Sequence, residues 1–129
     1  SIGINYRMIN GEYSADVMAR YEQLINHANI DFDCEYVTEA TAFSKMDEPY
    51  QLIADATRQT WEDSIVSPYI MMAATDSRYY HRISDHVYRF SPMQMHETER
   101  AMIHSVDESI KIDYFLDCVR FYLRLLKSL

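Results

Sequence analysis

The stretch Tyr69-Ile-Met-Met-Ala-Ala-Thr-Asp-Ser-Arg78 is the part of the sequence that most clearly indicates a fold. Its apolar half, residues 69–74, is short enough to form a strand buried on both faces, as in a parallel sheet covered by helices. Thr75 and Asp76 then start a short helix that is expected to run to about Ile83. A buried strand that leads directly into a helix is typical of an α/β protein.

The sequence before this stretch predicts a strand–helix–strand layer. Residues 2–9 and 30–37 alternate apolar with polar side chains, which predicts two strands that each have one wet face. Between them, apolar residues recur at helical spacing over 14–27, and Ser14 is a candidate cap. Because the pattern changes near 38–47, we expect a domain boundary there.

The rest of the chain alternates helices with a further strand. A helix is predicted over 47–65, where Pro49 suits the first turn, and a strand over 87–91. Residues 93–109 are polar and expected to be irregular, and apolar residues from Ile112 to Leu126 form the stripe of a terminal helix. Together these elements predict an α/β fold class.

Composition excludes several classes of function. The 129 residues carry a net charge of −8, which argues against binding to nucleic acid or to an anionic membrane. No apolar run approaches the roughly 20 residues of a membrane-spanning helix. With 2 glycines there is little room for a Gly-rich phosphate loop. Cys34 and Cys118 cannot form a disulfide framework and leave the compartment open, with the cytoplasm favoured over secretion.

Arg78 is the first candidate binding residue. It follows the predicted buried strand at its carboxyl end, where open α/β sheets place ligands. It also opens a helix, whose free N–H groups favour anions, and its forked guanidinium could bind a substrate carboxylate. A capping Thr75 or Asp76 followed by a surface Arg–Asp pair explains the same residues equally well.

His104 is the candidate metal ligand. It lies in a predicted loop over 102–108, and loops on a rigid scaffold commonly carry function. From the local sequence alone, an ordinary loop histidine is the favoured reading. The pair His96-Glu97 resembles the start of a zincin motif, but Arg100 occupies the position of the second histidine, so that motif is absent.

Three segments, taken in order, resemble one enzyme family. They are Ile4-Asn-Tyr-Arg-Met-Ile-Asn-Gly11, then Thr75-Asp-Ser-Arg-Tyr-Tyr with Val87-Tyr-Arg-Phe-Ser-Pro92, and finally Ile103-His-Ser-Val-Asp-Glu-Ser-Ile110. Their order and spacing resemble the C-terminal part of the co-catalytic zinc peptidases that include aminoacylase, acetylornithine deacetylase and carboxypeptidase S. The carboxypeptidase S-like branch is the most similar.

This resemblance implies a division of the chain and two site residues. Residues 1–42 would be the end of a ferredoxin-like lid or dimerisation domain, and residues 43–129 the C-terminal part of a catalytic α/β domain. His104 matches the family's last zinc-ligating histidine. Arg78 matches the arginine that contacts the substrate carboxylate. The complete enzyme would hold two zinc ions.

The remaining residues of the family's site are not in this sequence. The His-x-Asp motif, the bridging Asp and the Glu-Glu pair lie upstream in the family, and zinc needs three or four ligands. The opening Ser1 is no initiator Met, so we expect a piece of a longer protein that is inactive and does not hold zinc alone. Ala73-Ala74 replaces the family's usual glycine, and Asn10 replaces a proline.

The sequence therefore leads to two hypotheses of different classes. In the first, the parent protein is a zinc-dependent metallopeptidase or amidohydrolase that cleaves peptide or N-acyl amino acid amide bonds, and it forms homo-oligomers or self-associates as a fragment. In the second, the chain is a small acidic α/β interaction domain without catalytic activity. The edge of the first predicted strand would then be a docking site.

Overall fold

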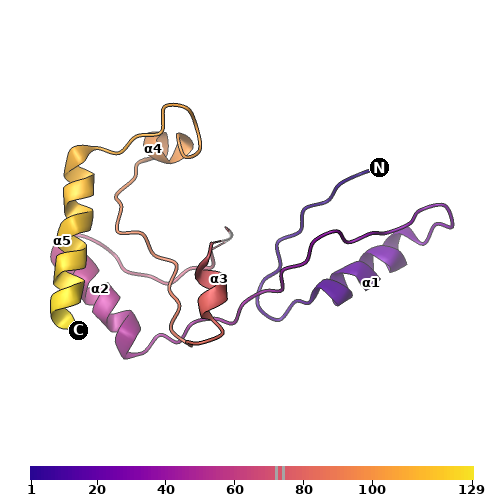
Figure 1. Ribbon diagram of the computed structural model, residues 1–129, viewed down its shortest axis with the longest axis horizontal. Coiled ribbons are helices and arrows are strands. Elements are labelled where there is room, and N and C mark those ends of the chain that lie inside the picture. The colour runs from indigo at the N-terminus through magenta and orange to yellow at the C-terminus, as the bar shows by residue number, and fades with distance from the viewer. Residues whose placement is uncertain (72, 74) are drawn as a thin grey trace.

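The computed structural model describes residues 1–71, 73 and 75–129, and its regular elements in these ranges are five helices. They are α1 (Ser14–Ile25), α2 (Glu48–Thr60), α3 (Ser77–Tyr80), α4 (Glu97–Ala101) and α5 (Ile112–Ser128). The molecule is elongated, with α1 and the N-terminus at one end, α2 and α5 at the other, and α3 between them (Figure 1). The helices predicted over 14–27, 47–65 and the C-terminal stripe are confirmed, with the second ending five residues early.

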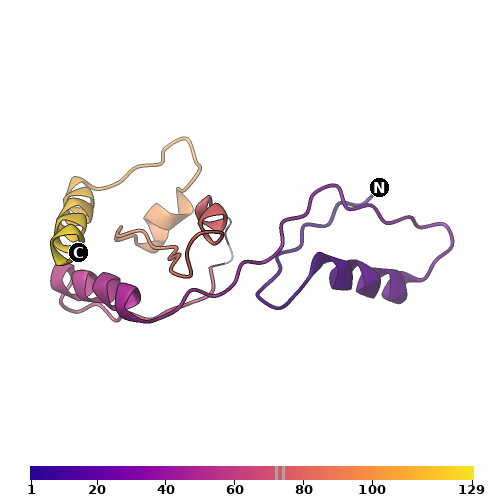
Figure 2. The ribbon, with the colours of Figure 1, turned by 60° about the horizontal axis from the view of Figure 1, so that its bottom comes forward.

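The start of α1 is held by a side chain distant in sequence. Tyr13 is the N-cap, and the backbone N–H of Ser14 donates to the Glu39 carboxylate at 3.1 Å. Such first-turn amides have no partner within the helix, so an acceptor from elsewhere stabilises the helix end. Asn26, with φ of 31°, ends the helix in the left-handed conformation. Two chain segments without regular structure run along α1 (Figure 2).

The packed part of the molecule lies between α2 and α5. Ala54 and Ala56 are buried on α2, and α2 packs against α5. Phe121 of α5 is 1% exposed at this contact. Arg124 also donates a hydrogen bond to the Thr60 hydroxyl at 2.8 Å, which joins the two helices further along.

One short helix lies where the sequence indicated irregular chain. Residues 93–109 contain α4, which begins because the side chain of Glu99 accepts the backbone N–H of His96 at 3.0 Å. This contact satisfies a donor that a helix start leaves free. Polar composition alone did not reveal it, because the residues on α4 have no apolar stripe.

The predicted strands are not found in the described ranges, so the structure does not confirm the α/β class. Within the described ranges no residue belongs to a β-strand, and residues 2–9, 30–37 and 87–91 run without a β-ladder. A strand is stabilised by hydrogen bonds to a neighbouring strand, and alternation of side chains supplies no neighbour. The predicted strand–helix–strand layer is therefore present as a chain path around α1 without its sheet.

The buried strand expected over 69–74 also differs from the structure. Residues 72 and 74 lie outside the described residues, and so does part of the Ala73-Ala74 substitution. Tyr69 and Ile70 are exposed. No sheet surrounds them within the described ranges, so their apolar side chains are not covered on both faces as a buried strand requires.

Side-chain contacts hold residues 44–47 against residues 84–88. Lys45 Nζ lies 2.6 Å from the Asp85 carboxylate, and this ammonium lowers the pKa of Asp85. His86 Nε2 lies 2.9 Å from the Asp47 carboxylate, and hydrogen bonding to His86 lowers the pKa of Asp47. These pairs bring the start of α2 beside the segment that follows α3.

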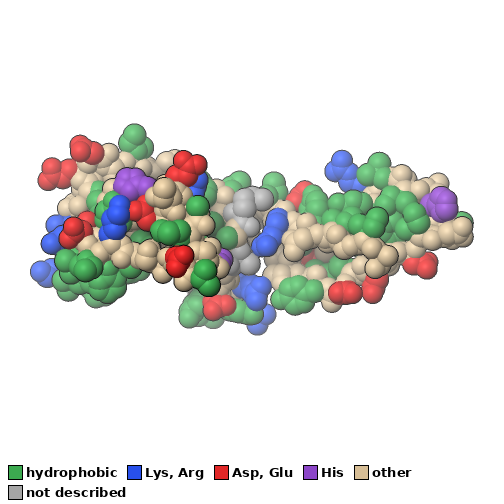
Figure 3. All heavy atoms as spheres, turned by 90° about the horizontal axis from the view of Figure 1, so that it is seen from above, with side chains coloured by type: hydrophobic (Ala, Val, Ile, Leu, Met, Phe, Trp, Pro, Cys, Tyr) green, Lys and Arg blue, Asp and Glu red, His purple; other side chains and the backbone are tan. Residues whose placement is uncertain are grey.

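Much apolar surface remains exposed. In the described part of the chain, four apolar residues are buried: Ala54, Ala56, Pro92 and Phe121. Ile2 and Ile65 are almost fully exposed, and hydrophobic side chains gather on the surface at both ends of the molecule (Figure 3). Exposed apolar surface on this scale marks a region that packs against other protein. None of the described helices is both long enough and apolar enough to cross a membrane.

Candidate functional site

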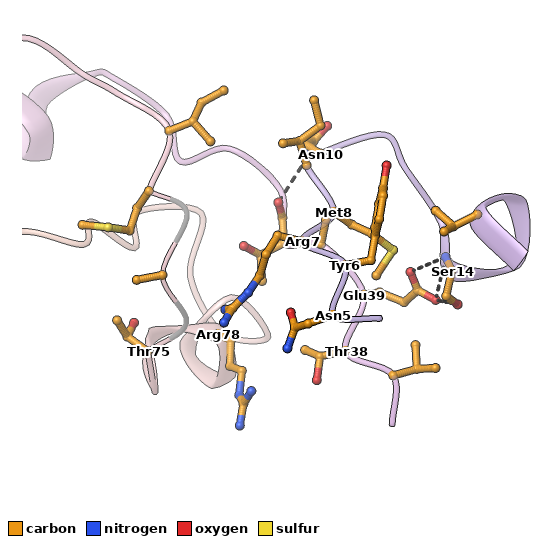
Figure 4. Close-up of a pocket in the computed structure, with 18 of the residues that line it drawn as sticks. Asn5, Tyr6, Arg7, Met8, Asn10, Ser14, Thr38, Glu39, Thr75 and Arg78 are labelled. Carbon is orange, nitrogen blue, oxygen red and sulfur yellow. Dashed lines mark hydrogen bonds between the residues drawn. The ribbon is translucent and has the colours of Figure 1, made fainter. Parts of the chain in front are cut away.

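A broad hollow lies between the first 44 residues and the segment around α3. It has a volume of about 1920 Å³, and its lining is mainly apolar, with polar groups from residues 5–10, 38–41 and 75–78. Figure 4 shows these polar side chains on two sides of the hollow, which are formed by the N-terminal part and by α3. We refer to this space as the hollow, and it is the concave surface on which a ligand could be bound.

Arg78 lines the hollow and is half-buried. Its Nη2 donates a hydrogen bond to the Tyr79 hydroxyl at 2.9 Å, and its guanidinium lies 4.8 Å from the centre of that ring. The bond to Tyr79 raises the pKa of Arg78, so the charge is maintained at any physiological pH. No ion pair involves Arg78 within the described residues, so the alternative of a surface Arg–Asp pair is not realised.

Tyr36 also lines the hollow and is coupled electrostatically to Arg78. A hydrogen bond from Thr38 is the main cause that lowers the pKa of Tyr36, and the charge of Arg78 is the second. The local sequence patterns do not reveal this coupling, because Tyr36 and Arg78 are far apart in sequence.

The start of α3 does not offer the predicted set of free amides. The Ser77 N–H donates to the Thr75 hydroxyl at 3.2 Å, and the Arg78 N–H is directed to the Thr75 carbonyl at 3.3 Å. With one turn of helix and these amides engaged, an anion would have to be bound by the Arg78 side chain. The sequence predicted that free amides at the start of this helix would help to bind an anion, and this prediction is wrong for the Ser77 and Arg78 amides.

Arg7 is a second guanidinium on the hollow. Its side chain approaches that of Arg78 from the N-terminal segment (Figure 4). Arg89 also lines the hollow, but it donates to the Ser77 hydroxyl at 2.9 Å and to the Thr41 hydroxyl at 3.2 Å. Sequence reasoning singled out neither arginine, because each lies within an alternating segment where a polar residue is expected on the wet face.

His104 lies apart from the hollow, in the loop between α4 and α5. Its backbone has φ of 67°, in the left-handed region that few non-glycine residues adopt. Its backbone N–H donates to the Glu108 carboxylate at 3.1 Å, and its side chain is exposed. His104 does not line the hollow, so this structure does not bring together the two residues that the sequence singled out.

The residues described here do not compose a complete metal site. No group of three or more His, Cys, Asp or Glu side chains that could hold a metal ion occurs among them. The exposed imidazole of His104 suits zinc as a single ligand, but zinc requires three or four. His104 could therefore bind zinc only together with further ligands.

The chain belongs to a family of peptidases. The model of peptidase family M20/M25/M40 matches residues 3–128, which is nearly the whole sequence. This match includes both Arg78 and His104. The resemblance seen in the sequence is confirmed, and the family is one of hydrolases.

Individual relatives point to the carboxypeptidase S-like branch. "Probable carboxypeptidase S-like 1" of Dictyostelium discoideum is 31% identical over 129 residues, 98% of this chain and 27% of the relative. "Probable carboxypeptidase S-like 2" of the same organism is 27% identical over 97% of this chain and 24% of the relative.

A further relative is "N-fatty-acyl-amino acid synthase/hydrolase PM20D1.1" of Danio rerio. It is 25% identical over 97% of this chain and 25% of the relative. The chain thus spans about a quarter of the length of these curated relatives. No solved structure matches it significantly.

Proposed function

We propose that the complete polypeptide containing this chain is a zinc-dependent metallopeptidase or amidohydrolase. Its substrates would be peptides or N-acyl amino acids, cleaved at the amide bond. The observation that carries this proposal is the family match over residues 3–128 together with Arg78, which is half-buried on a mainly apolar hollow and has no ion-pair partner among the described residues. This chain alone would be inactive.

The hollow supports a substrate that carries both a carboxylate and an apolar group. Arg78 would bind the carboxylate through its forked N–H donors. The apolar lining would accept an aliphatic side chain or acyl chain. The name N-fatty-acyl-amino acid synthase/hydrolase describes a substrate with this combination of groups, and the name carboxypeptidase S-like describes action at a carboxyl terminus.

His104 would contribute one neutral imidazole to the zinc site, and residues outside this chain would supply the other ligands. When bound, zinc would polarise the amide carbonyl and activate the attacking water. Residues 1–42 would then be the end of a lid domain, and residues 43–129 the closing part of a catalytic α/β domain. The segments that lack a sheet here would pair with strands from the rest of the polypeptide.

The test is an assay of the protein expressed from its complete gene. N-acyl amino acids and dipeptides are supplied with either a free or an amidated C-terminus, and bound zinc is measured by elemental analysis. Arg78→Ala is expected to raise KM for the free carboxylate by about 100-fold, since a charge-assisted bidentate contact is lost. KM for the amidated substrates should change little.

The matched control is Arg82→Ala, which removes an exposed arginine four residues further along. It should leave both KM values unchanged. Failure of the zinc-loaded protein to hydrolyse any of these substrates would contradict the proposed function. The non-catalytic alternative is disfavoured by the peptidase family match, which covers residues 3–128.

A further inference from the structure

The loop that carries His104 is closed at its base by an ion pair. Glu99 of α4 and Lys111, the residue before α5, lie on either side of loop 102–110, and Lys111 Nζ is 2.8 Å from the Glu99 carboxylate. The Glu99 side chain is 12% exposed and that of Lys111 58%. Lys111 is the main cause that lowers the pKa of Glu99 to about 2, so the carboxylate is charged throughout the physiological range.

A second pair of side chains reinforces this closure. Tyr114 of α5 shares a hydrogen bond of 2.9 Å with His96 Nε2, directly before α4. Its hydroxyl also accepts from Lys111 Nζ at 3.4 Å, and that ammonium lies 4.9 Å from the centre of the tyrosine ring. His96, Glu99, Lys111 and Tyr114 form a continuous cluster, which we name the clasp.

Inside the loop the backbone adopts a restrained conformation. His104 has φ of 67°, and the Glu108 carboxylate accepts its backbone N–H at 3.1 Å. A non-glycine residue in this region costs free energy and persists when its surroundings fix it. Turns from Ser105 to Met102 and from Glu108 to Ser105 also fold the loop onto itself. The loop is thus held at its base by the clasp and internally by its own hydrogen bonds.

We infer that the clasp positions His104 by fixing the two ends of the loop that carries it. The inference rests on the proposed function, because it takes His104 as a metal ligand. Lys111 and Glu99 are then positioning residues, because they act through the two ends of the loop that carries His104. Groups that orient a ligand commonly change metal affinity or activity by about 10- to 100-fold when they are removed.

The clasp lowers the conformational entropy of the loop by fixing its two ends. Opening the Glu99–Lys111 pair would free both ends of nine residues, and the backbone at His104 could then relax from its left-handed conformation. The imidazole would then sample many positions, and only a small fraction of them would allow it to bind the metal. Binding of substrate at the hollow would be unaffected, because His104 does not line it.

The experiment compares variants of the protein expressed from its complete gene. Lys111→Met removes the ion pair, Lys111→Arg preserves it, and Lys127→Met is the matched control in the last turn of the same helix. Backbone amide exchange of residues 102–110, zinc affinity by competition with a chelator, and kcat and KM are measured for each. A milder variant, Tyr114→Phe, keeps the ion pair and breaks the bond to His96.

In Lys111→Met we expect amide exchange in the loop to rise about tenfold, with zinc affinity and kcat each about tenfold lower and KM within about twofold. Lys111→Arg should restore all three, and Tyr114→Phe should show a smaller change in the same direction. Unchanged loop exchange in Lys111→Met, or a defect that Lys111→Arg does not restore, would overturn the inference.

A last variant separates this inference from the proposed function. If His104→Ala retains full zinc content and kcat, the assignment of His104 as a ligand fails, and the positioning role fails with it. If His104→Ala loses zinc while Lys111→Met leaves exchange, zinc affinity and kcat unchanged, the proposed function stands and the clasp alone is refuted.

Discussion

Trp61 and Phe121 stack with their ring centroids 6.2 Å apart and their planes inclined by 24°. This contact joins the end of α2 to the middle of α5. Phe90 also lies against Phe121, with centroids 5.2 Å apart. Phe121 is therefore the side chain on which three segments of the packed region meet.

Replacing Phe121 by Ala should destabilise the packing of α2 against α5. Truncation of a buried aromatic residue leaves a cavity and costs about 3–5 kcal/mol. We expect amide exchange in both helices to accelerate correspondingly, measured in the protein expressed from its complete gene. Phe115→Ala removes the same side chain at a position that is 56% exposed, and is the control. Equal effects of the two substitutions would contradict the central role of Phe121.

The Glu99 carboxyl should titrate near pH 2. Its folded pKa of about 2 lies below the reference value of 4.5, so its ionised form stabilises the fold above about pH 4.5. That contribution is lost as the pH falls from about 4.5 towards 2. A ¹³C titration of the carboxyl carbon measures this pKa directly, and Lys111→Met should raise it towards 4.5. A wild-type carboxyl that titrates near 4.5 would show that the ion pair does not form.

Zinc should bind only weakly to a polypeptide of residues 1–129. His104 is one ligand, and the described residues hold no group of three metal-binding side chains. Tetrahedral zinc sites need about four ligands, so low affinity without defined stoichiometry is expected. Isothermal titration calorimetry checks this, with His104→Ala as the comparison. A tight one-to-one site would show that the ligand set lies within these residues.

The same polypeptide should self-associate in solution. It buries four apolar residues in its described part, while Ile2, Ile65 and many others are exposed. Burial of such surface drives association at roughly 25 cal/mol per Å². Light scattering should therefore report oligomers or aggregates. A stable monomer with one sharp unfolding transition would contradict this expectation and would favour an autonomous interaction domain.

The helices could be predicted from the sequence because their signals are local. Apolar residues at 3.6-residue spacing identified α1, α2 and α5, and Pro49 marked the start of α2. The order and spacing of three motifs also identified the peptidase family, which the match over residues 3–128 confirms. A helix closes its hydrogen bonds within one segment, so a single stretch of sequence contains most of the information it needs.

Contacts between distant segments were decided by the tertiary structure alone. Glu39 holds the start of α1 across 25 residues, Tyr114 reaches His96 across 18, and Arg7 and Arg78 both line the hollow. Alternation over 2–9 predicted a strand, but a strand exists only when a second segment supplies its hydrogen bonds. Amino-acid order determines which faces are apolar and which residues can react. Which of these residues come into contact depends on the path of the whole chain through space. Each such contact has two partners that are distant in sequence, and a local sequence pattern describes only one of them.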